Sequence, residues 1–108
     1  MPTVNVYYTK LKPDFDSVTA KIKEFLVSEL SGSEIKLTPR EISVRFTRVA
    51  GDGMIGSIEI EIHAHAFEER IKKQDEICRK LRDYLMKEYS NLGDIRIWLM
   101  LPQLGHSW

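Results

Sequence analysis

The chain has 108 residues, of which 43% are hydrophobic and 30% charged, a length and composition typical of one folded domain with its own core. Its 16 basic and 16 acidic residues cancel, which excludes bulk electrostatic binding to nucleic acid, and no apolar run is long enough to cross a membrane. The single cysteine excludes an intrachain disulfide and, with no secretory signal in the first residues, predicts a cytoplasmic protein.

The first half of the chain predicts a strand, a helix and a second strand. Residues 3–9 alternate between apolar and polar side chains, which is typical of a strand with one covered face. After a loop, Asp16 or Ser17 is expected to cap an amphipathic helix that ends at residues 31–33. Alternation returns over residues 41–49 and predicts the second strand.

The second half repeats this order. A glycine-rich turn over residues 51–56 leads to the most regular strand of the chain, residues 58–65. Residues 67–89 carry apolar side chains at helical spacing and predict one long amphipathic helix. A last strand is expected to begin at Ile95 and to end at Pro102.

This order predicts an α+β fold in which duplicated β-α-β units form a four-stranded mixed sheet with two helices on one face. We expect one domain over residues 1–108, its units covering about 2–50 and 57–108. The other face of the sheet is expected to be largely polar. It carries Arg45, Thr47, Glu59, Glu61, His63, His65, Arg96 and Trp98.

Pro2 is the first candidate for chemistry. Proline is tolerated at the first residue of an edge strand, which gives it a purely structural interpretation. If Met1 is removed, however, the chain begins with a secondary amine held at the head of a strand. The pKa of an α-amine is ordinarily about 8, and burial or a nearby cation lowers it toward neutrality. Such an amine is well suited to act as a general base.

Met-Pro at the head of an alternating strand, the doubled β-α-β order and the chain length together resemble the tautomerase superfamily. This superfamily includes 4-oxalocrotonate tautomerase, 5-carboxymethyl-2-hydroxymuconate isomerase and macrophage migration inhibitory factor. Residues 37–45 resemble the segment that enters the second strand there, and the resemblance assigns Arg45 to the substrate's carboxylate or 2-oxo group. Lys12 falls where short members of the superfamily place an arginine, although a lysine offers a point charge rather than a bidentate fork.

The resemblance also implies partners and further site residues. Superfamily members are trimers with sites between subunits, so a homotrimer without a cofactor is expected, acting on a small anionic 2-oxo acid or 2-hydroxy-dienoate. Arg40 is an alternative to Lys12 as the second cation. Arg70 is the nearest match to the basic residue that leads into the second helix in the isomerase branch. Neither a nucleic acid nor a membrane is an expected partner.

Other interpretations remain open at this stage. Arg45 could instead pair with Glu59 or Glu61 across the sheet. The whole chain could be a non-catalytic, ferredoxin-like binding or interaction module, in which the proline only begins a strand. It could also be a hydrolytic enzyme that uses the same amine to activate water. A proline still joined to Met1 would have no basic nitrogen.

His63 and His65 share a strand face with a spacing that metal sites use, and His106 is a possible further ligand. Hydrogen-bonded histidines on a polar face are the more usual outcome, so no metal is expected. Cys78 falls on the apolar side of the second helix and is interpreted as a small buried side chain.

Overall fold

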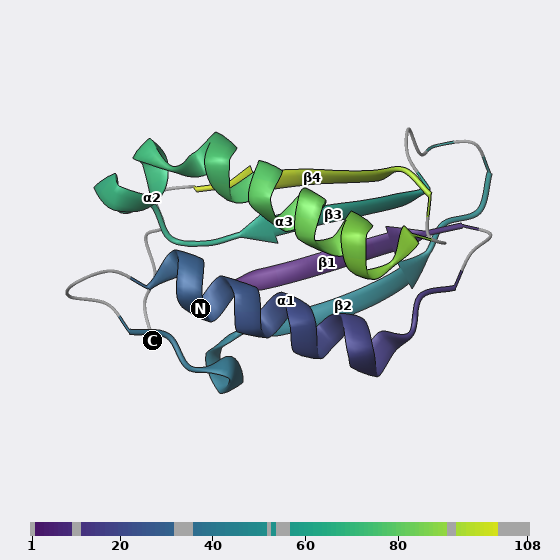
Figure 1. The fold of residues 1–108 in the computed structure, drawn as a ribbon, viewed down its shortest axis with the longest axis horizontal. Coiled ribbons are helices and arrows are strands. Elements are labelled where there is room, and N and C mark those ends of the chain that lie inside the picture. Colours follow the sequence, from purple (N-terminus) through teal and green to yellow (C-terminus); the bar gives the residue numbers. More distant parts are fainter. Residues whose placement is uncertain are drawn as a thin grey trace.

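The computed structural model describes residues 2–9, 12–31, 36–51, 53, 57–90 and 93–101. Within these residues, four strands and three α-helices follow one another, with a short 3-10 turn before the second strand (Figure 1). In chain order they are β1 (Thr3–Tyr8), α1 (Phe15–Leu30), η1 (Pro39–Glu41), β2 (Ser43–Arg48), β3 (Ile58–His63), α2 (Glu68–Lys72), α3 (Gln74–Glu88) and β4 (Ile95–Met100). Among the described residues, no helix is long and apolar enough to cross a membrane.

The strands form one sheet in the order β2-β1-β3-β4. The pairs β1–β2 and β3–β4 are parallel, and the central pair β1–β3 is antiparallel. Each parallel pair is joined by helical chain that crosses back over the same face of the sheet, α1 in the first half and α2 with α3 in the second (Figure 1). The predicted α+β architecture, with a mixed four-stranded sheet and helices on one face, is therefore confirmed.

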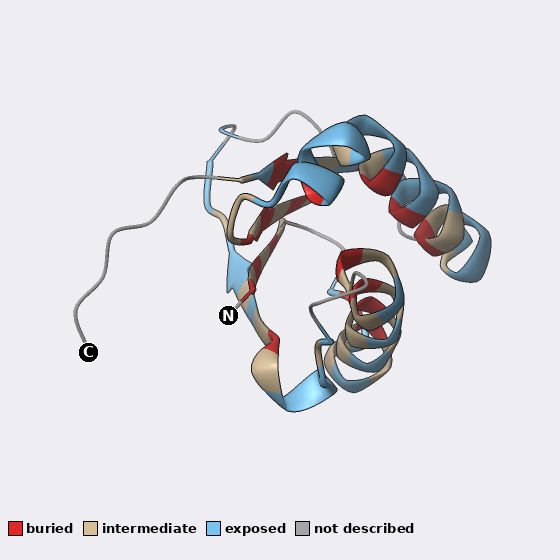
Figure 2. Cartoon of the chain, turned by 90° about the vertical axis from the view of Figure 1, so that its left-hand side faces the viewer, coloured by how far each residue is buried: buried red, intermediate tan, exposed pale blue. Residues whose placement is uncertain are grey.

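The core lies between the sheet and the helices, where Figure 2 shows the buried residues on the inner sides of both layers. Alternate residues of each strand enter this core because successive side chains of a strand point to opposite faces. Burying a large aliphatic side chain in this way contributes about 1.5–3 kcal/mol. The buried hydrophobic residues are Val4, Val6, Val18, Ile22, Leu26, Leu30, Ile42, Ile58, Ile60, Ile62, Ala64, Ile77, Leu81, Leu85, Ile95 and Leu99.

The first helix begins earlier than the sequence predicts. Asp14, not Asp16 or Ser17, is its N-cap, and the Asp14 carboxylate accepts a hydrogen bond of 3.2 Å from the main-chain N–H of Ser17. Phe15, the first helical residue, stacks on Phe46 of β2 with ring centroids 4.3 Å apart. This tertiary contact places the N-cap of α1 two or three residues before the expected position.

The predicted single helix over residues 67–89 is two helices, α2 and α3, separated at Lys73. The break turns α2 so that Arg70 points inward with 5% of its surface exposed, whereas Ile71 is 53% exposed. Ile71 is therefore not part of the apolar stripe to which the sequence assigned it. Gln74 secures the start of α3, because its side-chain amide donates to the carbonyl of Leu99 at 2.7 Å.

Gly93, in the turn before β4, is predicted to resist substitution. Its φ is +79°, and an added Cβ would lie 2.8 Å from Ser57 Oγ. Gly51 also has a positive φ, +90°, and among the described residues beyond its chain neighbours no atom lies within 4 Å of an added Cβ, so it is a control with a positive φ but without this crowding. We expect Gly51→Ala to lower the free energy of unfolding by about 1 kcal/mol and Gly93→Ala by about 2 kcal/mol, measured by urea denaturation. Equal losses in the two variants would contradict a role for the Ser57 contact.

Candidate functional site

Pro2 lies buried at the head of β1. Its carbonyl accepts a hydrogen bond of 3.1 Å from the N–H of Ser43, which ties it to the start of β2. The antiparallel register places Pro2 opposite Ala64, a buried residue directly after β3. Met1 lies outside the described residues. Residue 2 is thus held between two strand ends and away from water, conditions that disfavour the charged form of an amine.

Arg45 lies exposed on the face of the sheet that the helices leave open. It pairs with Asn5, so it stands three residues further along the sheet than Pro2 and on the opposite face. Strand spacing places the two Cα atoms about 11 Å apart. Glu61 is opposite Asn5 on the other side, so β1 separates Arg45 from both acids of β3. Within the described residues Arg45 makes no ion pair.

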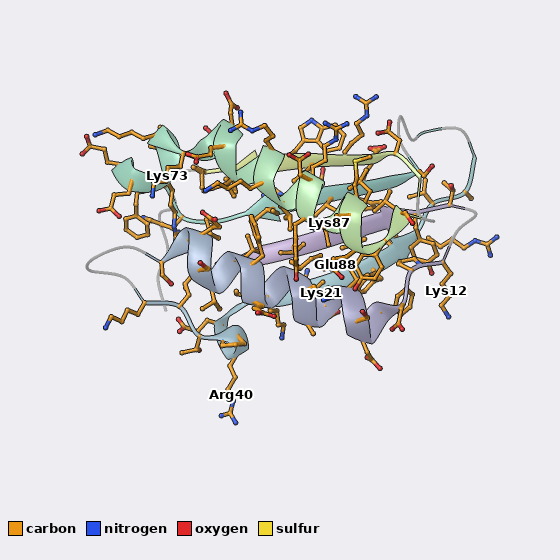
Figure 3. The ribbon with its side chains drawn as sticks, viewed as in Figure 1. Lys12, Lys21, Arg40, Lys73, Lys87 and Glu88 are labelled. Atoms are coloured by element: carbon orange, nitrogen blue, oxygen red, sulfur yellow. The ribbon has the colours of Figure 1, made fainter. Side chains whose placement is uncertain are left out.

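The two candidates for a second cation lie near opposite ends of the β1–β2 pair, and both side chains point away from the ribbon (Figure 3). Lys12 follows the far end of β1, exposed, with its ammonium 4.9 Å from the ring centroid of Phe15. A strand of this length spans about 20 Å, so Lys12 does not meet Pro2 within one chain. Arg40 belongs to η1, at the end of the sheet where Pro2 lies, and is also exposed.

Arg70 occupies an internal position. Its Nε and Nη2 donate to the carbonyl of Leu30, at 3.2 and 3.1 Å, and its Nη1 donates to the carbonyl of His65 at 2.9 Å. Its Cζ lies 4.7 Å from the ring centroid of Phe67. Burial lowers the pKa of Arg70. The Arg70 guanidinium, expected to bind a substrate, is therefore directed at the end of α1 and at the segment after β3.

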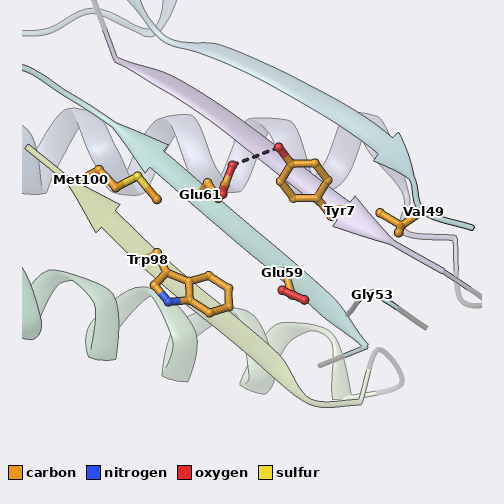
Figure 4. Close-up of a pocket in the computed structure, with 7 residues that line it drawn as sticks. All are labelled: Tyr7, Val49, Gly53, Glu59, Glu61, Trp98 and Met100. Carbon is orange, nitrogen blue, oxygen red and sulfur yellow. Dashed lines mark hydrogen bonds between the residues drawn. The ribbon is translucent and has the colours of Figure 1, made fainter. Parts of the chain in front are cut away.

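The open face contains a hollow of about 370 Å³. Tyr7 and Glu61 meet there: the Tyr7 hydroxyl donates to Glu61 Oε1 at 2.9 Å (Figure 4). This hydrogen bond is the main cause that raises the pKa of Tyr7, with smaller contributions from burial and from the charge of Glu61. The residues that line the hollow are Tyr7, Val49, Gly53, Glu59, Glu61, Trp98 and Met100.

The sequence places Glu59, Glu61 and Trp98 on this face but does not reveal the Tyr7–Glu61 hydrogen bond. Tyr7 is opposite Glu59 and reaches the diagonal acid, Glu61. The alternation of residues 3–9 assigns Tyr7 to a face, and only the register between β1 and β3 identifies its partner. Register is a tertiary property that the pattern of one strand does not determine.

The described part of the chain contains no group of three or more His, Cys, Asp or Glu side chains that could hold a metal ion. His65 instead packs against Phe67, with ring centroids 4.8 Å apart, and His106 lies outside the described residues. Cys78 is half-buried, and burial raises the pKa of its thiol, so the unreactive thiol form is favoured.

No protein-family model and no curated protein matches this sequence. Its fold nevertheless matches a macrophage migration inhibitory factor-like protein from Entamoeba histolytica over 98% of this chain and 95% of that one, with a TM-score of 0.64 and 12% identity. A fused 4-OT (4-oxalocrotonate tautomerase), solved as an asymmetric trimer, matches over 96% of this chain and 91% of its own, with a TM-score of 0.66 and 12% identity.

A third solved structure extends the likeness to the isomerase branch. A 5-carboxymethyl-2-hydroxymuconate isomerase from Deinococcus radiodurans R1 matches over 99% of this chain and 87% of its own, with a TM-score of 0.60 and 16% identity. At such identities the matches establish the fold rather than the reaction. They extend over nearly the whole chain and confirm the resemblance drawn from the sequence: this chain has the fold of the tautomerase superfamily.

Proposed function

We propose that this protein is a cofactor-independent tautomerase or isomerase that uses Pro2, freed from Met1, as a general base. The observation that carries the proposal is the burial of Pro2 at the head of β1 in a tautomerase fold. Burial destabilises a charged amine and lowers its pKa, so a free Pro2 nitrogen would be available near neutral pH to remove a proton from carbon. The proposed substrate is a small 2-oxo or 2-hydroxy-dienoate acid.

Arg45 is proposed to hold the substrate's carboxylate. Proton transfer between carbon and oxygen in such acids builds negative charge on a dienolate oxygen, and a guanidinium can hold the neighbouring carboxylate through two parallel hydrogen bonds. Arg45 is exposed and free of ion pairs within the described residues, so its fork is available. Since Pro2 and Arg45 face opposite sides of one sheet, they are proposed to meet between two copies of the chain.

The second cation is also proposed to come from a residue that one copy places beside the Pro2 of another, or from the same copy. Lys12, at the far end of β1, would reach the Pro2 of another copy, and Arg40 is the alternative at the Pro2 end of the same copy. Arg70 is not assigned a substrate contact, because its fork is already engaged by the carbonyls of Leu30 and His65.

A homotrimer is the proposed assembly. Trp98 and Met100 are 39% and 38% exposed on the open face, and covering such side chains stabilises an assembly. That face carries both signs of charge, with Arg45 and Arg96 on the edge strands and glutamates on β3 between them, so copies can complement one another. The fused 4-OT whose fold this chain shares is itself a trimer.

The catalytic proposal is tested on protein from which Met1 has been removed. We expect it to ketonise the enol of a 2-oxo acid, followed by absorbance, and Arg45→Ala to lower kcat/KM about 100-fold because the bidentate carboxylate contact is lost. A residue added before Pro2 turns its nitrogen into an amide and should lower kcat/KM by about 100-fold or more. Arg82→Ala, at an exposed position of α3, is the matched control and should keep full activity.

A protein with a free Pro2 that is inactive on a panel of such enols would contradict the proposal. That outcome would favour the non-catalytic, ferredoxin-like module.

The proposed assembly predicts the effect of a charge on the open face. Analytical ultracentrifugation should give about three times the chain mass of 12.6 kDa, and Trp98→Glu should release monomers, because it adds a carboxylate beside the two glutamates of the hollow. Ile71→Glu adds the same charge at an exposed apolar position on α2, away from the open face, and should leave the mass unchanged. A wild-type protein that is monomeric at micromolar concentrations would contradict the trimer.

A further inference from the structure

We propose that Arg70 is a positioning residue for Pro2. Its buried guanidinium clamps the end of α1 to the turn after β3 and supplies a fixed positive charge that keeps a free Pro2 nitrogen neutral. The use of that nitrogen as a base rests on the proposed function above. The effect of Arg70 on its protonation does not, and it can be measured in an inactive protein.

The guanidinium is held in one place by three hydrogen bonds. Two of them go to the carbonyl of Leu30, the last residue of α1, and the third goes to the carbonyl of His65. The last carbonyls of a helix lack partners within the helix and carry its negative dipole end, so a cation is favoured there. Arg70 therefore fixes α1 against the segment that follows β3.

The charge of Arg70 lies near Pro2. The register places Pro2 opposite Ala64, and His65, which follows, accepts the bond of 2.9 Å from Arg70 Nη1. Spacings across and along an antiparallel pair then place the guanidinium within roughly 10 Å of the Pro2 nitrogen. Pro2 also alternates onto the helix-covered face of the sheet, and Leu30 is the last residue of α1, so Pro2 and the Arg70 guanidinium lie on the same side of the sheet.

Among the residues that the structure describes, other titratable groups lie at this end of the molecule. They include His63 at the end of β3, His65 after it, Arg40, Glu41 and Arg45 on η1 and β2, Glu29 on α1, and Glu68, Glu69 and Lys72 on α2.

These groups have other partners or more contact with water. Glu29 lies 3.6 Å from Lys80, Glu68 lies 3.4 Å from Lys72, and Glu41 accepts bonds from Thr38. Water and salt screen exposed charges strongly. Among the described residues, Arg70 is the one charged residue that is buried, and both of its hydrogen-bond acceptors are neutral carbonyls. Water therefore screens the electrostatic field of the Arg70 guanidinium at Pro2 less than it screens the field of the described surface charges.

The size of the effect follows from distance. One unit charge at about 10 Å, at an effective dielectric constant of about 20, lowers the pKa of an amine by about one unit. Removing the charge should therefore raise the pKa of Pro2 by about one unit. Because the base must be neutral to accept a proton, the acid limb of a kcat/KM profile should move to higher pH by the same amount.

The test follows Pro2 directly by NMR. In protein labelled with ¹⁵N-proline and freed from Met1, Pro2 carries the one proline nitrogen that titrates, and its chemical shift reports its pKa. We expect Arg70→Met and Arg70→Gln to raise this pKa by about one unit, whereas Arg70→Lys, which keeps the charge, should leave it within about 0.3 unit. Arg82→Met removes a charge at an exposed position of α3 and should leave it unchanged.

If Arg70→Met fails to fold, Arg70→Gln serves as the neutral variant, because its side-chain amide can still donate a hydrogen bond to the carbonyl of Leu30. A folded neutral variant with an unshifted Pro2 pKa would overturn the proposal. So would an Arg70→Lys variant that shifts as far as the neutral ones, since geometry rather than charge would then be the cause. A shifted Pro2 pKa in a protein without tautomerase activity would support this inference while contradicting the proposed function.

Discussion

The antiparallel pairing of β1 with β3 determines where the candidate site residues of this chain lie. It joins two parallel strand pairs into one sheet and sets the start of β1 against the end of β3. Pro2 thereby lies opposite Ala64, and His65 and the Arg70 clamp follow within a few residues. The same pairing sends Tyr7 and Glu61 to the open face, where they form a hydrogen bond. A slip by one residue would reverse every one of these placements.

The sheet could be predicted from the sequence because its signal is local. Regular alternation, as in residues 58–63, marks both a strand and its buried face, and the structure buries Ile58, Ile60 and Ile62 as that pattern requires. The ends of the helices depend on contacts that the pattern does not contain. Phe15 joins α1 because it stacks on Phe46, and the later helix breaks at Lys73 where α2 turns Arg70 inward.

The residues of the candidate site also differ in how far the sequence predicts them. Pro2 could be singled out because a proline directly before an alternating strand is a local signal. The hydrogen bonds of Arg70 could not be predicted, because its main acceptor, the carbonyl of Leu30, is 40 residues away in the chain. The preference of a buried guanidinium for unpaired carbonyls at a helix end becomes visible only when that end has been placed.

The open face has a different character from the covered one. Its hollow combines an indole and a thioether with two carboxylates, so neither water nor a purely apolar partner suits all of it. Tyrosine, tryptophan and methionine are enriched in the contact regions of oligomers, whereas glutamate is depleted there unless a partner supplies the opposite charge. In the proposed assembly, the open faces of neighbouring copies supply opposite charges to one another. Because the proposed site forms only between copies, activity would fall when dilution dissociates the assembly.

The length of β1 has a consequence for the symmetry of such an assembly. Pro2 lies at one end of β1 and Lys12 lies beyond the other end. Each copy would therefore contribute Pro2 to the site shared with one neighbour and Lys12 to the site shared with the other. Head-to-tail contacts either close into a ring or grow into a filament, and a closed ring gives every copy the same surroundings. In a ring, a single defective copy would impair both of the sites that it shares with its two neighbours. One inactive subunit would then remove more activity than one subunit contributes.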